Sequence, residues 1–258
     1  MKRLLIAAAA LAVPAVLAVS AVLAGAASAD AQDRRGRDGR GGSERNSYAN
    51  PSAVIAAELA FAQAAQDKGQ WTAFAEAAAS DAVMFVPKMV YAQGWLKGRA
   101  NPPQAVKWQP HEVWSSCDGS LVVSRGAWQK WDGQRPKSVG YFTTLWQRQK
   151  DGKYKWILDS GDVLKEAEPA PEMIAGHVAD CPERGTRPSA PPVVRIGKGS
   201  AKALPPLDPK HRAGKSNDGT LTWEVTVDPS GARNLSVEWK KEGAVSPVLI
   251  EEVAAGNG

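Results

Sequence analysis

The chain has 258 residues, a net charge of +5 at neutral pH and only two cysteines. So small a positive charge argues against binding to nucleic acid through a basic surface. Two cysteines and three histidines in this arrangement do not form a metal-binding motif, so we expect neither a metal nor a cofactor.

The first 29 residues have the pattern of a secretory signal peptide. A positively charged start precedes an apolar run over residues 4–23, and Ala27-Ser28-Ala29 matches the small-x-small cleavage pattern. The run is also long enough for an uncleaved membrane anchor, but Pro14 and the small residues at its end favour cleavage before Asp30. We therefore expect a periplasmic or secreted protein, with no stable membrane anchor after signal cleavage.

Residues 30–49 are rich in glycine and arginine and have no hydrophobic periodicity. This composition predicts a disordered leader. A weak electrostatic contact between its arginines and an anionic envelope surface is the alternative interpretation. Without the signal peptide the net charge is +3.

Residues 50–165 are predicted to form a single α+β domain. Asn50 and Pro51 are typical of a helix start, and an apolar stripe at helical spacing follows, in which Glu58 also falls. Further on, aromatic and β-branched residues alternate with polar ones between Asp-Gly turns, a pattern that predicts an antiparallel meander. In chain order the expected elements are helices 50–69 and 70–79, strand 81–87, a short helix 93–97, and strands 107–116, 120–131, 138–150 and 154–164.

The composition changes after residue 165. Residues 166–215 are predicted to contain one amphipathic helix, over 171–180, followed by a linker rich in proline and glycine. Residues 216–258 alternate apolar and polar positions around a turn, which predicts a β-hairpin extension. We expect this extension to pack on the main domain, because an isolated ribbon of this size is marginally stable in water.

Cys117 and Cys181 are predicted to form a disulfide, which an oxidising compartment permits. The bond would hold the C-terminal part of the chain to the sheet. Two free buried thiols are the alternative.

The 52–164 region resembles the nuclear transport factor 2-like superfamily, in particular its SnoaL-like and uncharacterised bacterial branches. The resemblance rests on the segments AAELAFAQAAQDKGQWTAF, SDAVMFVP, KWQP, SCDGSLVVSRGAW and GYFTTLWQRQKDGKYKWILDSG. It implies helices packed in a strongly curved antiparallel sheet, a cone-like or cystatin-like roll that encloses a largely apolar cavity. Members include steroid isomerases, dehydratases and polyketide cyclases as well as proteins without known catalysis, so the resemblance implies a cavity but no particular reaction.

Enzymes of this superfamily use a carboxylate, or a carboxylate and a histidine, as general base. The candidate catalytic residues are accordingly Asp159 and His111. Each has a structural alternative, because Asp159 begins the turn-like string DSGD and His111 is a single histidine within a predicted strand.

Aromatic side chains supply the candidates for a ligand-binding surface. The chain has ten tryptophans, and packing of the sheet is the ordinary role for most of them. Because a shift of one residue in register reverses the side-chain direction, spacing alone does not separate packing from ligand binding. The candidate ligand-binding residues are Tyr91, Trp95, Trp128, Tyr141 and Trp146.

The sequence therefore favours an exported protein with a cone-shaped apolar cavity that binds a small organic or envelope-derived ligand. One alternative is a cofactor-independent isomerase, dehydratase or cyclase. Another is a structural module that forms a homodimer through the open sheet face.

Overall fold

The structure is a computed structural model, and it describes residues 49–181 and 204–256. The predicted signal peptide, all of the predicted leader except residue 49, and residues 182–203 of the predicted linker lie outside the described residues. One compact unit spans Glu44–Gly258, and every described residue belongs to it. No helix among the described residues is long and apolar enough to cross a membrane.

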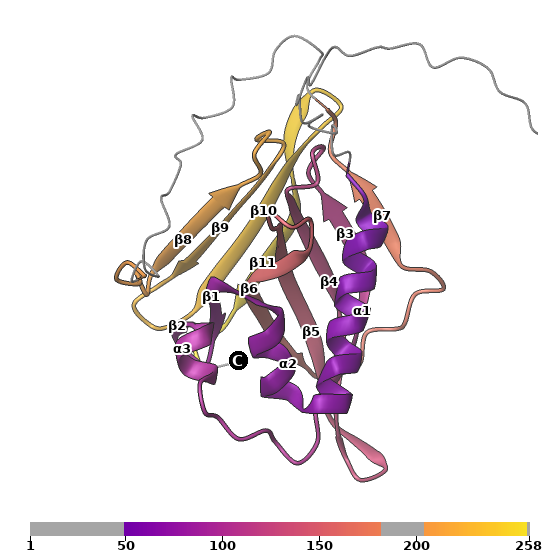
Figure 1. Cartoon of the computed structure of the whole chain (residues 1–258), viewed down its shortest axis with the longest axis vertical. Helices are drawn as coiled ribbons and strands as arrows, with labels where there is room; N and C mark the ends of the chain where they lie inside the picture. The colour runs from indigo at the N-terminus through magenta and orange to yellow at the C-terminus, as the bar shows by residue number, and fades with distance from the viewer. Residues whose placement is uncertain (1–48, 182–203, 257–258) are drawn as a thin grey trace, which may run out of the picture. The chain divides into compact units, whose positions relative to one another are not determined.

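Three helices and eleven strands make up the described residues (Figure 1). The helices are α1 (Pro51–Lys68), α2 (Gln70–Ala77) and α3 (Ala92–Leu96). The strands are β1 (Ala78–Phe85), β2 (Met89–Tyr91), β3 (Lys107–Ser115), β4 (Leu121–Asp132), β5 (Arg135–Arg148), β6 (Tyr154–Leu164), β7 (Ala175–Val178), β8 (His211–Lys215), β9 (Leu221–Val227), β10 (Arg233–Lys241) and β11 (Ala244–Val253).

The strands form two sheets. The larger has seven strands in the order β2-β1-β6-β5-β4-β3-β7, and the smaller has four in the order β11-β10-β9-β8. In the larger sheet β3, β4, β5 and β6 form the predicted meander, but β1 pairs in parallel with β6 and β7 pairs in parallel with β3. The smaller sheet is antiparallel throughout.

The predicted fold class, helices packed in a strongly curved antiparallel sheet with a C-terminal β-hairpin, is wrong. Of the described residues 49% lie in strands and 17% in helices, the larger sheet is mixed, and the C-terminal part is a four-stranded sheet. The helix predicted over 171–180 is replaced by the short strand β7. The reason is long-range pairing: β7 gains backbone hydrogen bonds from β3, a partner that the local pattern of residues does not reveal.

The two faces of the larger sheet have different neighbours. Ser124, Thr144 and Asp159 are register partners on three adjacent strands and lie on what we call the helix face, because Ser124 contacts Glu58 of α1. The residues one position along, Arg125, Thr143 and Ser160, lie on the opposite face. We call this the extension face, because β10 and β11 of the smaller sheet contact it through Arg233 and Glu251.

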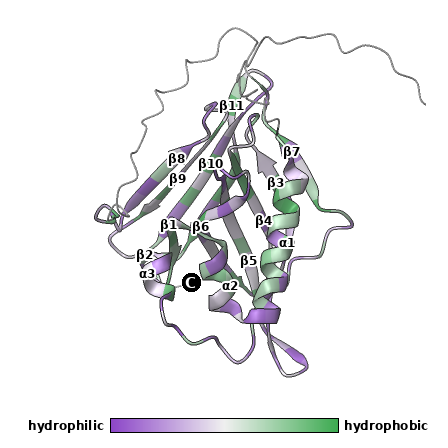
Figure 2. Ribbon diagram, in the orientation of Figure 1, coloured by the Kyte–Doolittle hydropathy of each residue, from purple (hydrophilic) through white to green (hydrophobic). Residues whose placement is uncertain are grey.

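The helix face carries the aromatic core of the protein. The ring of Phe61, on α1, lies 4.8 Å from the rings of both Phe74 and Trp108, and 6.1 Å from that of Trp146. Phe74 in turn lies 6.0 Å from Trp156. Figure 2 shows that α1 is largely hydrophobic along its length, in agreement with the apolar stripe in the sequence.

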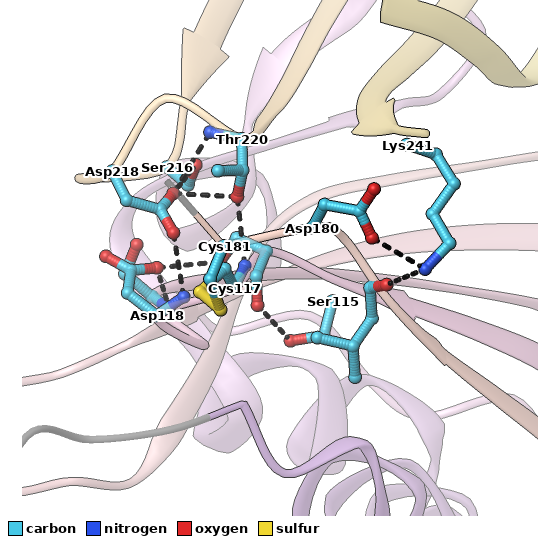
Figure 3. Close-up of a disulfide and its surroundings, with 12 residues drawn as sticks. Ser115, Cys117, Asp118, Asp180, Cys181, Ser216, Asp218, Thr220 and Lys241 are labelled. Carbon is cyan, nitrogen blue, oxygen red and sulfur yellow. Dashed lines mark hydrogen bonds and ion pairs between the residues drawn. A yellow bond between two sulfur atoms is a disulfide. The ribbon is translucent and has the colours of Figure 1, made fainter. Parts of the chain in front are cut away.

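Two turns of nearly identical structure join the sheets. In the sequence SCDGSL (116–121) the Ser116 hydroxyl donates to Asp118 at 2.8 Å, and in SNDGTL (216–221) the Ser216 hydroxyl donates to Asp218 at 2.6 Å. The turns also bind each other reciprocally. The Cys117 N–H donates to the Thr220 hydroxyl (Figure 3), and the Asn217 N–H donates to the Ser120 hydroxyl. The smaller sheet is therefore attached to the larger one at its turn as well as across its face.

The predicted disulfide between Cys117 and Cys181 is confirmed, with the two Cα atoms 5.1 Å apart. It joins the first of these turns to the segment that follows β7. Next to it, Asp180 accepts a hydrogen bond from Lys241 Nζ at 2.9 Å (Figure 3), and it also accepts one from the Glu242 N–H. A disulfide at this position is typical of proteins in an oxidising compartment, as expected for an exported protein.

Candidate functional site

A buried carboxyl group lies between α1 and the larger sheet. Glu58 is fully buried, and its carboxyl group accepts hydrogen bonds from Ser124 Oγ at 2.6 Å, Trp108 Nε1 at 2.8 Å and Trp146 Nε1 at 2.9 Å. Burial raises the pKa of Glu58, and the three hydrogen bonds oppose that rise. The group is thus held rigidly, with donors on both oxygens.

Glu58 was missed as a functional candidate although the sequence contains a signal for it. It lies four residues after Val54 and three before Phe61, so it falls on the apolar stripe of α1. A charged residue at such a position has to be paired, neutral or functional, because an isolated buried charge is costly.

Asp159 is the second carboxyl group of the helix face. Its Oδ2 accepts a hydrogen bond from the Thr144 hydroxyl at 3.0 Å. Burial raises the pKa of Asp159 to about 7, and the negative charge of Glu58 adds to the rise, while Thr144 and the positive charge of Arg233 oppose it. Unlike its register partner Thr144, which is fully buried, Asp159 keeps intermediate exposure. It is therefore an enclosed acid that solvent still reaches.

A carboxyl group with a pKa of about 7 exists in both protonation states near neutral pH. Such a group can accept or donate a proton at the pH where a general acid–base catalyst works best. Trp156, also on β6, packs 6.0 Å from the ring of Phe74, and in the described part of the chain its buried indole N–H has no hydrogen-bond partner. The helix face thus combines a titratable acid with a donor that lacks an acceptor.

His111, the other predicted catalytic residue, does not join Asp159. Its Nδ1 lies 3.8 Å from an oxygen of Glu168, and Glu168 receives two hydrogen bonds from Arg125, which lies on the extension face. Burial lowers the pKa of His111, and the charge of Glu168 opposes that change. The structure therefore separates the two candidate bases, and the charge that raises the pKa of Asp159 is that of Glu58.

The three predicted ligand-binding residues in β4 and β5 are divided between different surroundings. Trp146 lies on the helix face and binds Glu58. Tyr141 lies on the extension face with the Arg125 guanidinium 5.0 Å from its ring, and burial together with Glu251 and Asp162 raises its pKa to about 12. Trp128 donates from Nε1 to the Tyr141 carbonyl at 3.0 Å, so its N–H is occupied within the sheet.

The two predicted ligand-binding residues outside the meander also have partners. The Tyr91 hydroxyl donates to the Pro205 carbonyl at 3.0 Å, which connects β2 to the segment before β8. The Trp95 ring packs 5.1 Å from the ring of Trp71 and carries the Arg99 guanidinium at 3.4 Å. The five residues thus have different neighbours, and their role in ligand binding stays a prediction.

Two hollows stand out among the described residues, and the predicted cone-shaped cavity is neither of them. One, of about 540 Å³, lies on the smaller sheet next to Trp223, Glu224 and Ser236. The other, of about 360 Å³, lies where β5 begins and β6 ends.

Comparison with known proteins finds no matching family model and no matching curated protein. The chain is similar, at a TM-score of 0.37 and 14% identity, to a crystal structure from Parabacteroides distasonis of a candidate ketosteroid isomerase. The similarity covers 47% of this chain and 98% of that chain. At this level it assigns neither a fold nor a reaction to the chain.

Proposed function

We propose that the protein is an exported binding protein whose helix face takes up a small organic molecule beside Asp159. One observation carries the proposal: Asp159 is enclosed, has a pKa raised to about 7, and yet keeps intermediate exposure among fully buried neighbours. A purely structural acid at this depth would be saturated by donors, as Glu58 is.

The chemistry of the ligand follows from the other groups of the helix face. Phe61, Phe74 and Trp108 supply an aromatic, largely apolar surface, which favours an organic molecule over an ion. The unpartnered Trp156 N–H favours a ligand with a hydrogen-bond acceptor such as a carbonyl oxygen. A ligand of this kind needs no cofactor.

The ligand can be sought directly in the exported protein. Wild-type protein is purified from its native compartment, and small molecules released on denaturation are identified by mass spectrometry. We expect an organic carbonyl compound in wild-type protein and in the exposed control Asp67→Asn, and roughly tenfold less of it in Asp159→Asn, because a lost charged hydrogen bond costs about 1.5–3 kcal/mol. Equal amounts in all three proteins, or no compound at all, would contradict binding at Asp159.

The pKa of Asp159 favours one second candidate, proton transfer within the bound ligand. In an isomerisation of a β,γ-unsaturated ketone, the ionised Asp159 carboxylate would remove the proton next to the carbonyl and return it to the γ-carbon. The C=C bond then moves into conjugation, and no proton or electron is gained overall.

This candidate predicts a rate that rises with pH through about 7, because the base has to be ionised. A β,γ-unsaturated ketosteroid is the probe, and the absorbance of its conjugated product is the readout. We expect Asp159→Asn to lower the rate at least about 100-fold and Asp67→Asn to leave it unchanged. A rate independent of Asp159 would exclude isomerisation and leave the binding proposal standing.

A further inference from the structure

One end of the larger sheet gathers basic side chains from three strands and from the residue that follows β6. The register places the start of β3 next to the end of β4, and the end of β4 next to the start of β5, while Val139 of β5 pairs with Leu164 of β6. Figure 2 shows the β4–β5 hairpin at this end as hydrophilic. We call this the basic end; its exposed cationic residues are Lys107, Lys130, Arg135, Lys137 and Lys165.

An open groove of about 360 Å³ lies within the basic end. Pro136, Val139 and Val163 contribute apolar surface to it, and Lys137 and Lys165 contribute positive charge. Val163 is 54% exposed although it is a large aliphatic residue at the end of a strand. The groove therefore combines apolar surface with cations instead of being uniformly polar.

Few acidic groups compensate these charges. Asp132 lies 4.0 Å from Lys137, at the limit of an ion pair, and both side chains are well exposed, so the pair is weak. Glu166 is the exposed acid next to Lys165. Asp162, which precedes the groove residue Val163, is a third acid, and its charge acts on Tyr141 and Arg233 on the extension face.

Lys107, another cation of the basic end, lies over an aromatic ring. Its Nζ lies 5.5 Å from the ring of Trp131, close to the tip of the β4–β5 hairpin. Tryptophan and lysine with exposed aliphatic residues are the side chains that proteins place at membrane–water interfaces.

We propose that the basic end docks reversibly on a lipid bilayer with anionic headgroups. The lysines and arginine would neutralise headgroup charges, while Val139 and Val163 rest against the acyl boundary. Charge complementarity and the apolar groove between the lysines carry the proposal. The contact is peripheral and differs from a membrane-spanning anchor. It is independent of ligand binding at Asp159.

The test compares three exported proteins that share the same N-terminus, determined by sequencing. They are wild type, the basic-end variant Lys130→Gln/Lys137→Gln/Lys165→Gln, and a control variant Lys150→Gln/Lys153→Gln/Lys240→Gln. The three control lysines are exposed and lie in the β5–β6 turn and on the smaller sheet. Their substitution removes the same number of positive charges as the basic-end variant does. Any contribution of the N-terminal segment cancels, because all three proteins carry it.

Binding is measured by sedimentation with phosphatidylcholine vesicles that contain or lack phosphatidylglycerol. Each lysine near an anionic surface contributes roughly a fivefold factor, so we expect the basic-end variant to bind on the order of a hundredfold more weakly. The control variant should bind nearly as well as wild type. Binding of wild type should also weaken as salt rises above about 0.1 M, where the Debye length is about 10 Å.

Three outcomes would overturn the proposal. The first is wild-type protein that does not distinguish anionic from neutral vesicles. The second is an equal loss in the basic-end and control variants, which would show a general charge effect. The third is binding to soluble polyphosphate without binding to vesicles, which would identify an anionic polymer as the partner. Circular dichroism of each variant checks that the fold is kept.

Discussion

The two faces of the larger sheet bury charged groups in different ways. On the helix face, Glu58 and Asp159 receive hydroxyl and indole hydrogen bonds, and neither forms an ion pair within the described part of the chain. On the extension face, Glu251 accepts from the Thr143 hydroxyl at 2.7 Å and lies 3.4 Å from Arg125. The same strands therefore carry acids held by hydroxyl and indole donors on one side and an ionic network on the other.

The partners of the two buried acids act on their pKa values in different ways. Burial raises the pKa of Glu251, and the hydrogen bond from Thr143 and the charges of Arg125 and Arg233 oppose the rise. Burial also raises the pKa of Asp159, to about 7; the hydrogen bond from Thr144 and the charge of Arg233 oppose this rise, and the charge of Glu58 adds to it. Burial is thus the main cause at both acids, and the two differ in that a like charge adds to it only at Asp159.

The largest expected effect concerns the pH dependence of stability. Asp159 has a folded-state pKa of about 7, above its ordinary value of 3.8, so between these values the folded protein holds a proton that the unfolded chain releases. The contribution of Asp159 to the free energy of unfolding is fully present below about pH 4. It is lost as the pH rises towards 7, by about 3 kcal/mol between pH 4.5 and 7. Urea unfolding of wild type and Asp159→Asn measures it.

Asp159→Asn should remove this contribution, and its unfolding free energy should be correspondingly flatter over that pH range. Asp67→Asn serves as the exposed control. If the unfolding free energy of Asp159→Asn fell with pH as steeply as that of wild type, the titrating group would have to be another residue.

The next prediction concerns how much the hydrogen bonds accepted by Glu58 contribute to the stability of the fold. Glu58→Ala leaves the Trp108 and Trp146 indoles and the Ser124 hydroxyl without their acceptor, whereas Glu58→Gln keeps an acceptor oxygen and nearly the same volume. We expect the alanine variant to be less stable than the glutamine variant by about 2 kcal/mol in chemical denaturation. Equal losses in both variants would show that the carboxylate charge itself is required on the helix face.

The smallest expected effect is the difference in stability lost when one serine on each face of the larger sheet is replaced by alanine. Ser124 donates to a buried carboxyl group at 2.6 Å, while Ser160 accepts from Arg233 at 3.3 Å. We expect Ser124→Ala to cost about 1 kcal/mol more than Ser160→Ala, because shorter hydrogen bonds to acidic groups are the stronger ones. Thermal unfolding of the two variants at one pH provides the comparison, and the reverse order would contradict the stronger role given to the helix-face network.

Local sequence patterns located most elements of the meander but not its pairing at the edges. The alternating pattern placed β3, β4 and β6 within one or two residues, and the Asn50-Pro51 signal placed the start of α1. The parallel partners of β1 and β7 stayed hidden, because parallel pairing joins segments that are distant in the chain. The strands of the smaller sheet were visible, apart from β8, which falls in the predicted linker.

Of the candidate site, the sequence indicated Asp159 but not Glu58. Asp159 was a candidate on the strength of a family resemblance, and it lies on the helix face beside an aromatic core. His111 and Tyr141 lie elsewhere because the bulge in β3 and the alternation of β5 set their directions, and neither can be read from spacing. Glu58 became significant only when α1 was placed against Ser124.

By itself the sequence determined the strands that local alternation can specify and, since only two cysteines exist, which two residues are available for a disulfide. Only the tertiary structure decided which face each side chain joins and which acid stands next to which. The physical reason is that hydrophobic periodicity is a local property of the chain, whereas burial and the pKa of a carboxyl group depend on neighbours that folding brings from distant segments.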